Sequence, residues 1–219
     1  MGKSSFLDVL SGFIKLEKNK GEVLLNKKNI LNWDVKKKSE YLAYLSQSQD
    51  VLFDELVREL LKVVDPEEKL IESLGKEFNV LNLLDRNFHS LSGGEKARVS
   101  LLRVILQLKI SRDQKDLKKD LSGRYLLLDE PLAHLDQIYQ KDFLSCLLKL
   151  KQEGLGILIA MHDLNLAWNY ADRLLIYFDG NLHECENKNI EKDKAQEGLI
   201  NKIKDFYGVS LKQEVSWSF

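Results

Sequence analysis

Three short segments of this sequence carry residue types that bind phosphate or activate water. The first is Gly2-Lys3-Ser4, which opens an apolar-periodic segment and matches the second half of the phosphate-binding loop G-x-x-x-x-G-K-[ST]. Glycine lets backbone N–H groups close on a phosphate, lysine reaches the outer phosphates, and the hydroxyl binds Mg²⁺ at the positive end of a helix. The competing interpretation is an ordinary helix start whose lysine faces water.

The second segment, residues 126–131, is an apolar run that ends in two adjacent carboxylates. A strand buried on both faces ends at the carboxyl edge of its sheet, where open α/β folds bind ligands. There Asp129 would hold Mg²⁺ through its water shell, and Glu130 would accept a proton from an attacking water molecule. A strand followed by an acidic turn is the alternative.

The third segment is Leu91-Ser92-Gly93-Gly94-Glu95. Two consecutive glycines cost a helix about 2 kcal/mol relative to better helix formers, but they let backbone N–H groups approach an anion at the helix start. Ser92 and Glu95 also match a capping box, so a well-started helix is the plainer interpretation.

The elements that must position these segments follow from hydrophobic periodicity. Apolar residues at helical spacing predict a helix over residues 3–13, several helices over 51–88, and helices over 136–153 and 163–171. Short apolar runs predict strands at 22–25, 41–46, 125–128, 155–161 and 174–178, with a tight turn at Asp179-Gly180. Strands that alternate with helices indicate an α/β fold with a mainly parallel sheet.

Composition excludes several classes of protein. The chain has 219 residues and a formal net charge of −1, with 44% hydrophobic and 31% charged residues. This composition is typical of a globular protein and not of a protein that coats nucleic acid. The longest uncharged apolar run, residues 154–161, is far shorter than a membrane span. Two cysteines and no secretory leader favour a reducing cytoplasm.

Three further residues complete an ordered set. Gln47 follows Tyr44-Leu45-Ser46, Asp136 precedes a predicted helix, and His162 ends a predicted strand. With the three segments above, they occur in the order of the ATP-binding cassette (ABC) ATPases, which the whole chain resembles. The resemblance implies a P-loop, RecA-like core with an inserted helical subdomain. The 219 residues would form one ABC ATPase domain, with 1–47 and 118–219 as the core and 48–117 as the helical signature subdomain.

The resemblance also implies roles for these residues, with ATP and Mg²⁺ as the cofactors. Glu130 would be the general base, His162 would contact the γ-phosphate, and Gln47 would sense Mg²⁺ and the attacking water. The residues implied to bind phosphate are Gly2, Lys3, Ser4 and Ser5. Those implied to lie near Mg²⁺ are Ser4, Gln47 and Asp129. Those implied to act across a head-to-tail homodimer are Ser92, Gly93, Gly94 and Asp136.

Within the family, residues 41–47 and Phe206-Tyr207-Gly208 resemble the ATPases of importers for vitamin B12, iron-siderophores and haem, with the B12 importer as the nearest match. The implied partners are integral-membrane permease subunits and, indirectly, a periplasmic or lipoprotein substrate-binding protein, with no nucleic acid. The implied location is the cytoplasmic face of the membrane.

The sequence departs from the family at its start. Nothing before Gly2 corresponds to the family's initial strands, to its aromatic residue that stacks on adenine, or to the first half of the phosphate loop. The chain therefore resembles an open reading frame that begins at an internal methionine. We expect the absence of the strand before the phosphate loop to leave the side chains of Leu126, Leu128 and Ile159 without part of their apolar cover. A nucleotide-incompetent remnant and a non-transport ABC ATPase acting on nucleic acid or ribosomes are the alternative functions.

Overall fold

A computed structural model of the chain describes residues 2–17, 20–47, 55–62, 67–109, 120–133, 135–178 and 181–186. The chain divides into two compact units, Met1–Ala160 and Met161–Phe219, which are described separately. The first unit holds a parallel sheet between helices, and this confirms the predicted α/β class.

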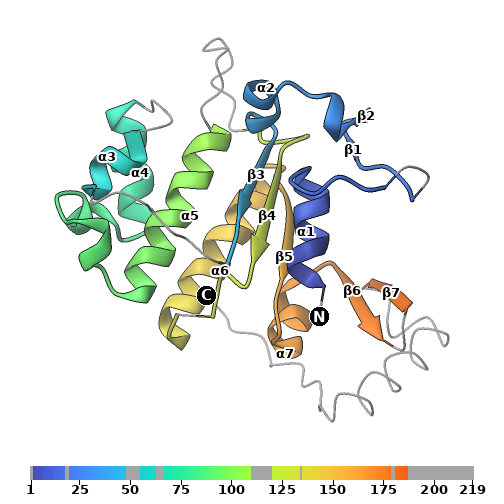
Figure 1. The fold of residues 1–219 in the computed structure, drawn as a ribbon. Helices are drawn as coiled ribbons and strands as arrows, with labels where there is room; N and C mark the ends of the chain where they lie inside the picture. The colour runs from blue at the N-terminus through green and yellow to red at the C-terminus, as the bar shows by residue number, and fades with distance from the viewer. Residues whose placement is uncertain are drawn as a thin grey trace. The chain divides into compact units, whose positions relative to one another are not determined.

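The sheet of the first unit has the order β3-β4-β5, and all three strands are parallel (Figure 1). The predicted strands at 41–46, 125–128 and 155–161 correspond to β3 (Leu42–Leu45), β4 (Tyr125–Asp129) and β5 (Gly156–Ala160). Leu45 pairs with Leu128 and Asp129 pairs with Ala160. The carboxyl ends of the three strands therefore meet at one edge of the sheet.

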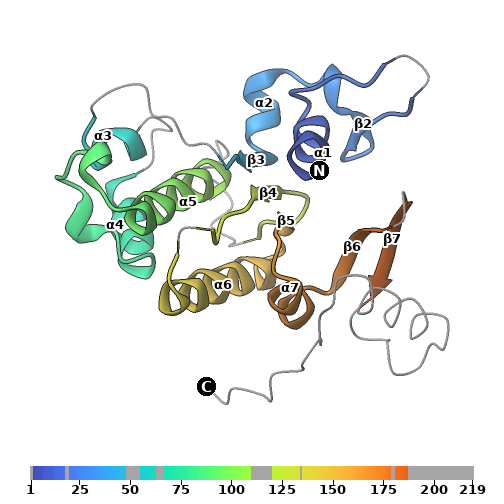
Figure 2. The same ribbon diagram turned by 60° about the horizontal axis from the view of Figure 1, so that its bottom comes forward.

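Helices cover both faces of this sheet. α1 (Lys3–Ser11) packs on one face, whereas α5 (Gly93–Lys109) and α6 (Gln137–Gln152) lie on the other (Figures 1 and 2). α1 ends two residues earlier than predicted because Gly12 adopts a left-handed conformation (φ 78°) and its N–H bonds back to Asp8 and Val9. The remaining elements of this unit are α2 (Val35–Ser39), α3 (Val57–Lys62), α4 (Glu68–Glu77), the antiparallel pair β1 (Leu24–Leu25) and β2 (Lys28–Asn29), and the 3₁₀ turns Ile30–Asn32, Leu81–Leu83 and Phe88–Ser90.

The core lies along the central strand. Leu126 and Leu128 have no exposed surface, so the expectation that they would lose their apolar cover is wrong for these two residues. The physical reason is that β4 is flanked by strands on both edges and covered by α1. Ile159, on β5, keeps partial exposure. Cys146 on α6 is a buried free thiol, as its apolar helix face predicts.

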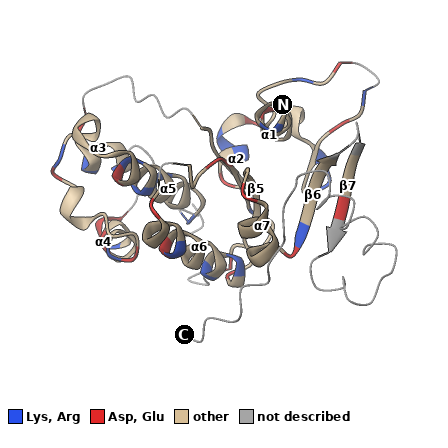
Figure 3. Ribbon diagram, turned by 90° about the horizontal axis from the view of Figure 1, so that it is seen from below, with Lys and Arg blue, Asp and Glu red and all other residues tan. Residues whose placement is uncertain are grey.

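The helical segment between β3 and β4 contains α3, α4 and α5, which pack together. Both basic and acidic residues lie along α4, α5 and α6 (Figure 3). The boundaries predicted for a helical subdomain, 48 and 117, fall outside the described residues, so this division of a single ATPase domain stays a prediction.

The second unit contains α7 (Leu164–Tyr170) and an antiparallel hairpin of β6 (Arg173–Phe178) and β7 (Asn181–Glu186). Phe178 pairs with Asn181. That pairing fits the hairpin predicted there, although the turn residues themselves lie outside the described residues, as do Phe206, Tyr207 and Gly208. In the part of the chain that is described, no helix combines the length and the apolar character needed to cross a membrane.

Candidate functional site

The N-terminus of α1 presents backbone donors at the sheet's carboxyl edge. Gly2 caps the helix with φ 118°, a conformation that glycine adopts without strain, and its carbonyl accepts the N–H of Phe6 at 2.9 Å. Ser4 and Ser5 are exposed in the first turn, which contains no acidic side chain. The positive end of the helix dipole is therefore available to an anion.

Lys3 reaches across this edge to Glu130. Its Nζ lies 2.6 Å from Glu130 Oε1, and the glutamate side chain is only 10% exposed. Glu130 takes a left-handed backbone conformation (φ 49°) immediately after β4, and its N–H donates to the carbonyl of Ala160 at 2.9 Å. The candidate lysine and the candidate base, 127 positions apart, are thus direct partners in this structure.

Asp129 is the buried member of the carboxylate pair. It is 3% exposed, and its Oδ1 has no hydrogen-bond partner among the described residues. A buried carboxylate oxygen left in this state is costly unless a cation or ordered water satisfies it. Ser4 and Asp129 supply oxygen atoms, the donors that Mg²⁺ prefers. The donor set therefore fits Mg²⁺, which proteins bind through one or two carboxylates and substrate phosphates. The described residues contain no group of three His, Cys, Asp or Glu side chains placed to hold a metal ion.

Gln47 and His162 follow two strands of the same sheet. Gln47 is exposed and, like Glu130, lies two residues beyond the Leu45–Leu128 pair, so both residues stand at the carboxyl edge. His162 is exposed and comes two residues after the end of β5, but it belongs to the second unit. The structure brings Lys3, Asp129 and Glu130 together at this edge, and the roles of Gln47 and His162 remain predictions.

Ser92, Gly93 and Gly94 begin α5. Ser92 Oγ accepts the N–H of Glu95 at 3.3 Å, and Glu95 Oε2 accepts the N–H of Ser92 at 2.8 Å, which is the capping box considered above. The hydrogen bond from Ser92 N–H, together with the nearby charge of Arg86, lowers the pKa of Glu95. Ser92 and Gly93 remain exposed. Because α5 lies on the sheet face opposite α1, this segment is directed away from the phosphate-binding helix of its own chain (Figures 1 and 2).

Asp136 caps α6. Its Oδ1 accepts the N–H groups of Ile138 and Tyr139 at 3.1 and 3.0 Å. The side chain is therefore a structural cap as well as a candidate for communication between subunits, and the two roles can be separated by mutation.

We expect Asp136→Ala to lower the free energy of unfolding by about 1 kcal/mol, because the cap is lost. Asp136→Asn keeps an oxygen that can accept the same N–H groups, so we expect about half that loss or less in denaturant titrations. If the carboxylate acts across the dimer, Asp136→Asn should still lower ATP turnover. Equal destabilisation by both substitutions would contradict the capping role.

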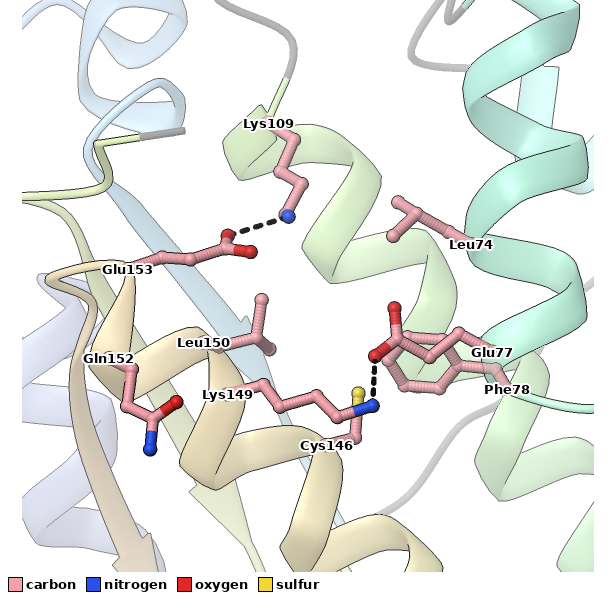
Figure 4. A pocket seen from close by; sticks show the side chains of 9 residues that line it. All are labelled: Leu74, Glu77, Phe78, Lys109, Cys146, Lys149, Leu150, Gln152 and Glu153. Carbon is pink, nitrogen blue, oxygen red and sulfur yellow. Dashed lines mark hydrogen bonds and ion pairs between the residues drawn. The ribbon is translucent and has the colours of Figure 1, made fainter. Parts of the chain in front are cut away.

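A cavity of about 410 Å³ lies elsewhere, between α4, α5 and α6 (Figure 4). Two ion pairs cross it, Lys109–Glu153 at 2.7 Å and Lys149–Glu77 at 2.9 Å. Burial raises the pKa of the Cys146 thiol to about 12, so it is a poor nucleophile. With all four charged side chains paired with one another, this cavity offers no reactive group and is distinct from the Lys3–Glu130 site.

One contact at the site has no counterpart in the sequence analysis, namely the direct ion pair between Lys3 and Glu130. The residues lie 127 positions apart, and nothing in the sequence around either of them indicates the other.

Comparison with known proteins shows the family to which the chain belongs. A sequence model of the family described as "ABC transporter" matches residues 1–109. Hemin import ATP-binding protein HmuV of Pseudomonas fluorescens is 33% identical over 192 residues, which cover 83% of this chain and 70% of that protein. The protein of the same name from Hydrogenovibrio crunogenus is 33% identical over 216 residues, covering 94% and 78%.

Solved structures share the fold. An ATP-binding subunit of an ABC transporter superposes with a TM-score of 0.73 at 22% identity and covers 94% of this chain and 83% of its own. CbiO1 from Clostridium perfringens, part of the cbiONQ complex, gives a TM-score of 0.66 at 24% identity, covering 93% and 78%. At these identities the superpositions support the fold alone.

Proposed function

Because the chain belongs to the ABC transporter family as the ATP-binding subunit of an importer, in which ATP hydrolysis is coupled to transport, we propose that its importer carries haem. Such subunits work as dimers with membrane permeases. The observation that carries the mechanism is the meeting of Lys3, Asp129 and Glu130 beside the N-terminus of α1.

In the proposed mechanism, ATP binding changes the partner of Lys3. In this structure its ammonium group is paired with Glu130, and the phosphates of ATP would compete for the same group. Backbone N–H groups at the start of α1 would bind the phosphates next to Lys3. When the Lys3 ammonium group pairs with the phosphates instead of with Glu130, the Glu130 carboxylate becomes able to accept a proton.

Asp129 and Ser4 would hold Mg²⁺, with Gln47 as a further ligand at the same edge. When bound, Mg²⁺ neutralises charge on the β- and γ-phosphate oxygens. Glu130 would take the proton of the attacking water, and its backbone bond to Ala160 fixes where the carboxylate stands. His162 would hydrogen-bond the γ-phosphate.

A second copy of the chain would complete the site. Ser92 and Gly93 are exposed and Gly94 is half-buried at the start of α5, on the sheet face away from their own α1, which favours contact with ATP bound by the partner subunit. Asp136 would relay the occupancy of one site to the other. The dimer would lie at the cytoplasmic face of the membrane, and a substrate-binding protein would deliver cargo from outside.

Haem is proposed in place of vitamin B12 because the relatives described above are named for hemin import. The test is uptake of labelled haem and labelled cobalamin by cells that lack this gene, complemented with the wild-type chain or with Glu130→Gln. We expect haem uptake to be lost and to be restored only by the wild-type chain, with cobalamin uptake unchanged. Loss of cobalamin uptake with normal haem uptake would overturn the choice of cargo.

A further inference from the structure

Arg86 joins the start of α5 to the segment of chain that precedes it. Its Nη1 donates to Glu95 Oε1 at 2.9 Å, and its Nη2 donates to the carbonyl of Ser90 at 3.3 Å. Glu95 belongs to the capping box, and its other carboxylate oxygen accepts the N–H of Ser92 at 2.8 Å. The guanidinium therefore holds, through one carboxylate, the residue at which the signature segment, residues 92–94, begins.

The backbone that carries Arg86 is itself held in place. The Arg86 carbonyl accepts the N–H of Val57, the first residue of α3, at 3.0 Å. Phe88, two residues later, is 1% exposed and donates its N–H to the carbonyl of Glu55 at 3.0 Å. Because residues 86–88 are bonded to residues 55–57, Arg86 extends toward Glu95 from a fixed support.

The capping box also determines what the Ser92 hydroxyl can offer to a ligand. Ser92 Oγ accepts the N–H of Glu95 at 3.3 Å, so this bond uses the oxygen as an acceptor. A serine hydroxyl has one donor and two acceptor sites, and its O–H can then be donated to a group outside the box. Because Ser92 is exposed, the box presents it as a hydrogen-bond donor, which is what a phosphate oxygen requires.

The negative charge of Glu95 opposes such a contact. The bond from Ser92 N–H, together with the charge of Arg86, lowers the pKa of Glu95, so the carboxylate is ionised at neutral pH. A carboxylate bonded to Ser92 would repel the phosphates of an approaching ATP. Arg86 places a positive charge 2.9 Å from this carboxylate and offsets the repulsion.

We propose that Arg86 is a positioning residue that holds Glu95 in the capping box and offsets its charge, so that the signature segment can bind the γ-phosphate of ATP held by the partner subunit. The inference rests on the contact between subunits in the proposed function. Stabilising the fold does not account for the ion pair, because the Arg86 and Glu95 side chains are 45% and 21% exposed and such surface pairs contribute little to stability.

The test uses the chain assembled with its membrane subunits and measures kcat/KM for ATP, the affinity for ADP and the melting temperature. Loss of a preorganised donor to a developing charge typically costs about 10²- to 10³-fold in turnover. Arg86 acts through Glu95 and not directly, so we expect Arg86→Gln to lower kcat/KM for ATP by a smaller factor, about 10-fold. The affinity for ADP, which lacks the γ-phosphate, and the melting temperature should not change.

A double variant separates positioning from a general loss of structure. Glu95→Gln keeps an oxygen that can accept the N–H of Ser92 but carries no charge, and glutamine also forms capping boxes. We therefore expect Glu95→Gln to stay within about threefold of wild type. In Arg86→Gln/Glu95→Gln there is no charge left to offset, so this variant should recover most of the loss seen in Arg86→Gln alone.

Arg58→Gln is the matched control. Arg58 also pairs with two carboxylates, those of Glu68 and Asp85, which are not part of the capping box. Its substitution should leave kcat/KM for ATP within about threefold of wild type, because exposed ion pairs contribute little.

Wild-type kcat/KM in Arg86→Gln, an equal loss in the double variant, or a parallel loss of ADP affinity would overturn the positioning role. Ser92→Ala removes the hydroxyl donor itself and should lower kcat/KM for ATP at least as much as Arg86→Gln. If Ser92→Ala kept the wild-type value, the contact between subunits in the proposed function would fail, and this inference with it. The Ser92→Ala measurement therefore separates the two failures.

Discussion

Glu130→Gln is expected to lower ATP turnover about 10²- to 10⁴-fold while ATP still binds. Glutamine has nearly the shape of glutamate but cannot accept a proton from water at neutral pH. The substitution also weakens the 2.6 Å contact that holds Lys3 at the carboxylate, so Lys3 becomes more available to phosphate. We therefore expect ATP affinity to stay equal or rise.

Glu77→Gln serves as the matched control for that variant. Glu77 also pairs with a lysine, Lys149 at 2.9 Å, but it does so beside the cavity between α4 and α6 (Figure 4). Its removal should leave turnover within about threefold of wild type, because surface ion pairs contribute about 1 kcal/mol or less. Near-normal turnover in Glu130→Gln would remove Glu130 from the role of base.

The sequence predicts the strands and the edge at which they end, because these features depend on local patterns. Residues 125–128 form a continuous apolar run, as a strand covered on both faces must, and the two carboxylates directly after it can only lie at the carboxyl edge. The family prediction is confirmed by the relatives and the fold.

Contacts between distant segments could not be predicted in the same way. Nothing around Lys3 or Glu130 indicates that they pair, because the contact depends on how α1 is placed on the sheet. The burial of Leu126 and Leu128 has the same origin. These two side chains are covered by β3, β5 and α1. How many strands flank β4 depends on the whole sheet, and the residues of β4 alone do not determine it.

Asp129→Asn is expected to abolish most of the effect of Mg²⁺ on ATP binding. Asp129 is buried and its Oδ1 has no hydrogen-bond partner among the described residues, which is costly to the stability of the fold. Asparagine keeps the size of the side chain but removes the charge that attracts the cation and its water shell. We expect the Mg²⁺-dependent gain in ATP affinity to fall about 10- to 100-fold.

The same substitution should not weaken the fold. The substitution relieves the cost of burying a carboxylate whose Oδ1 has no hydrogen-bond partner among the described residues, so the melting temperature of Asp129→Asn without nucleotide should equal or exceed that of the wild type. A variant that melts lower would show that the carboxylate is mainly structural.

The central claim is that the carboxyl edge with Lys3, Asp129 and Glu130 is where Mg²⁺-ATP binds. Equilibrium titration of ATP into the wild-type assembly and into Asp129→Asn, each with Mg²⁺ and with EDTA, tests it most directly. We predict that Mg²⁺ tightens binding to the wild-type assembly and has little effect on Asp129→Asn, while the two affinities in EDTA agree. The same Mg²⁺-dependent gain in both proteins would contradict the claim.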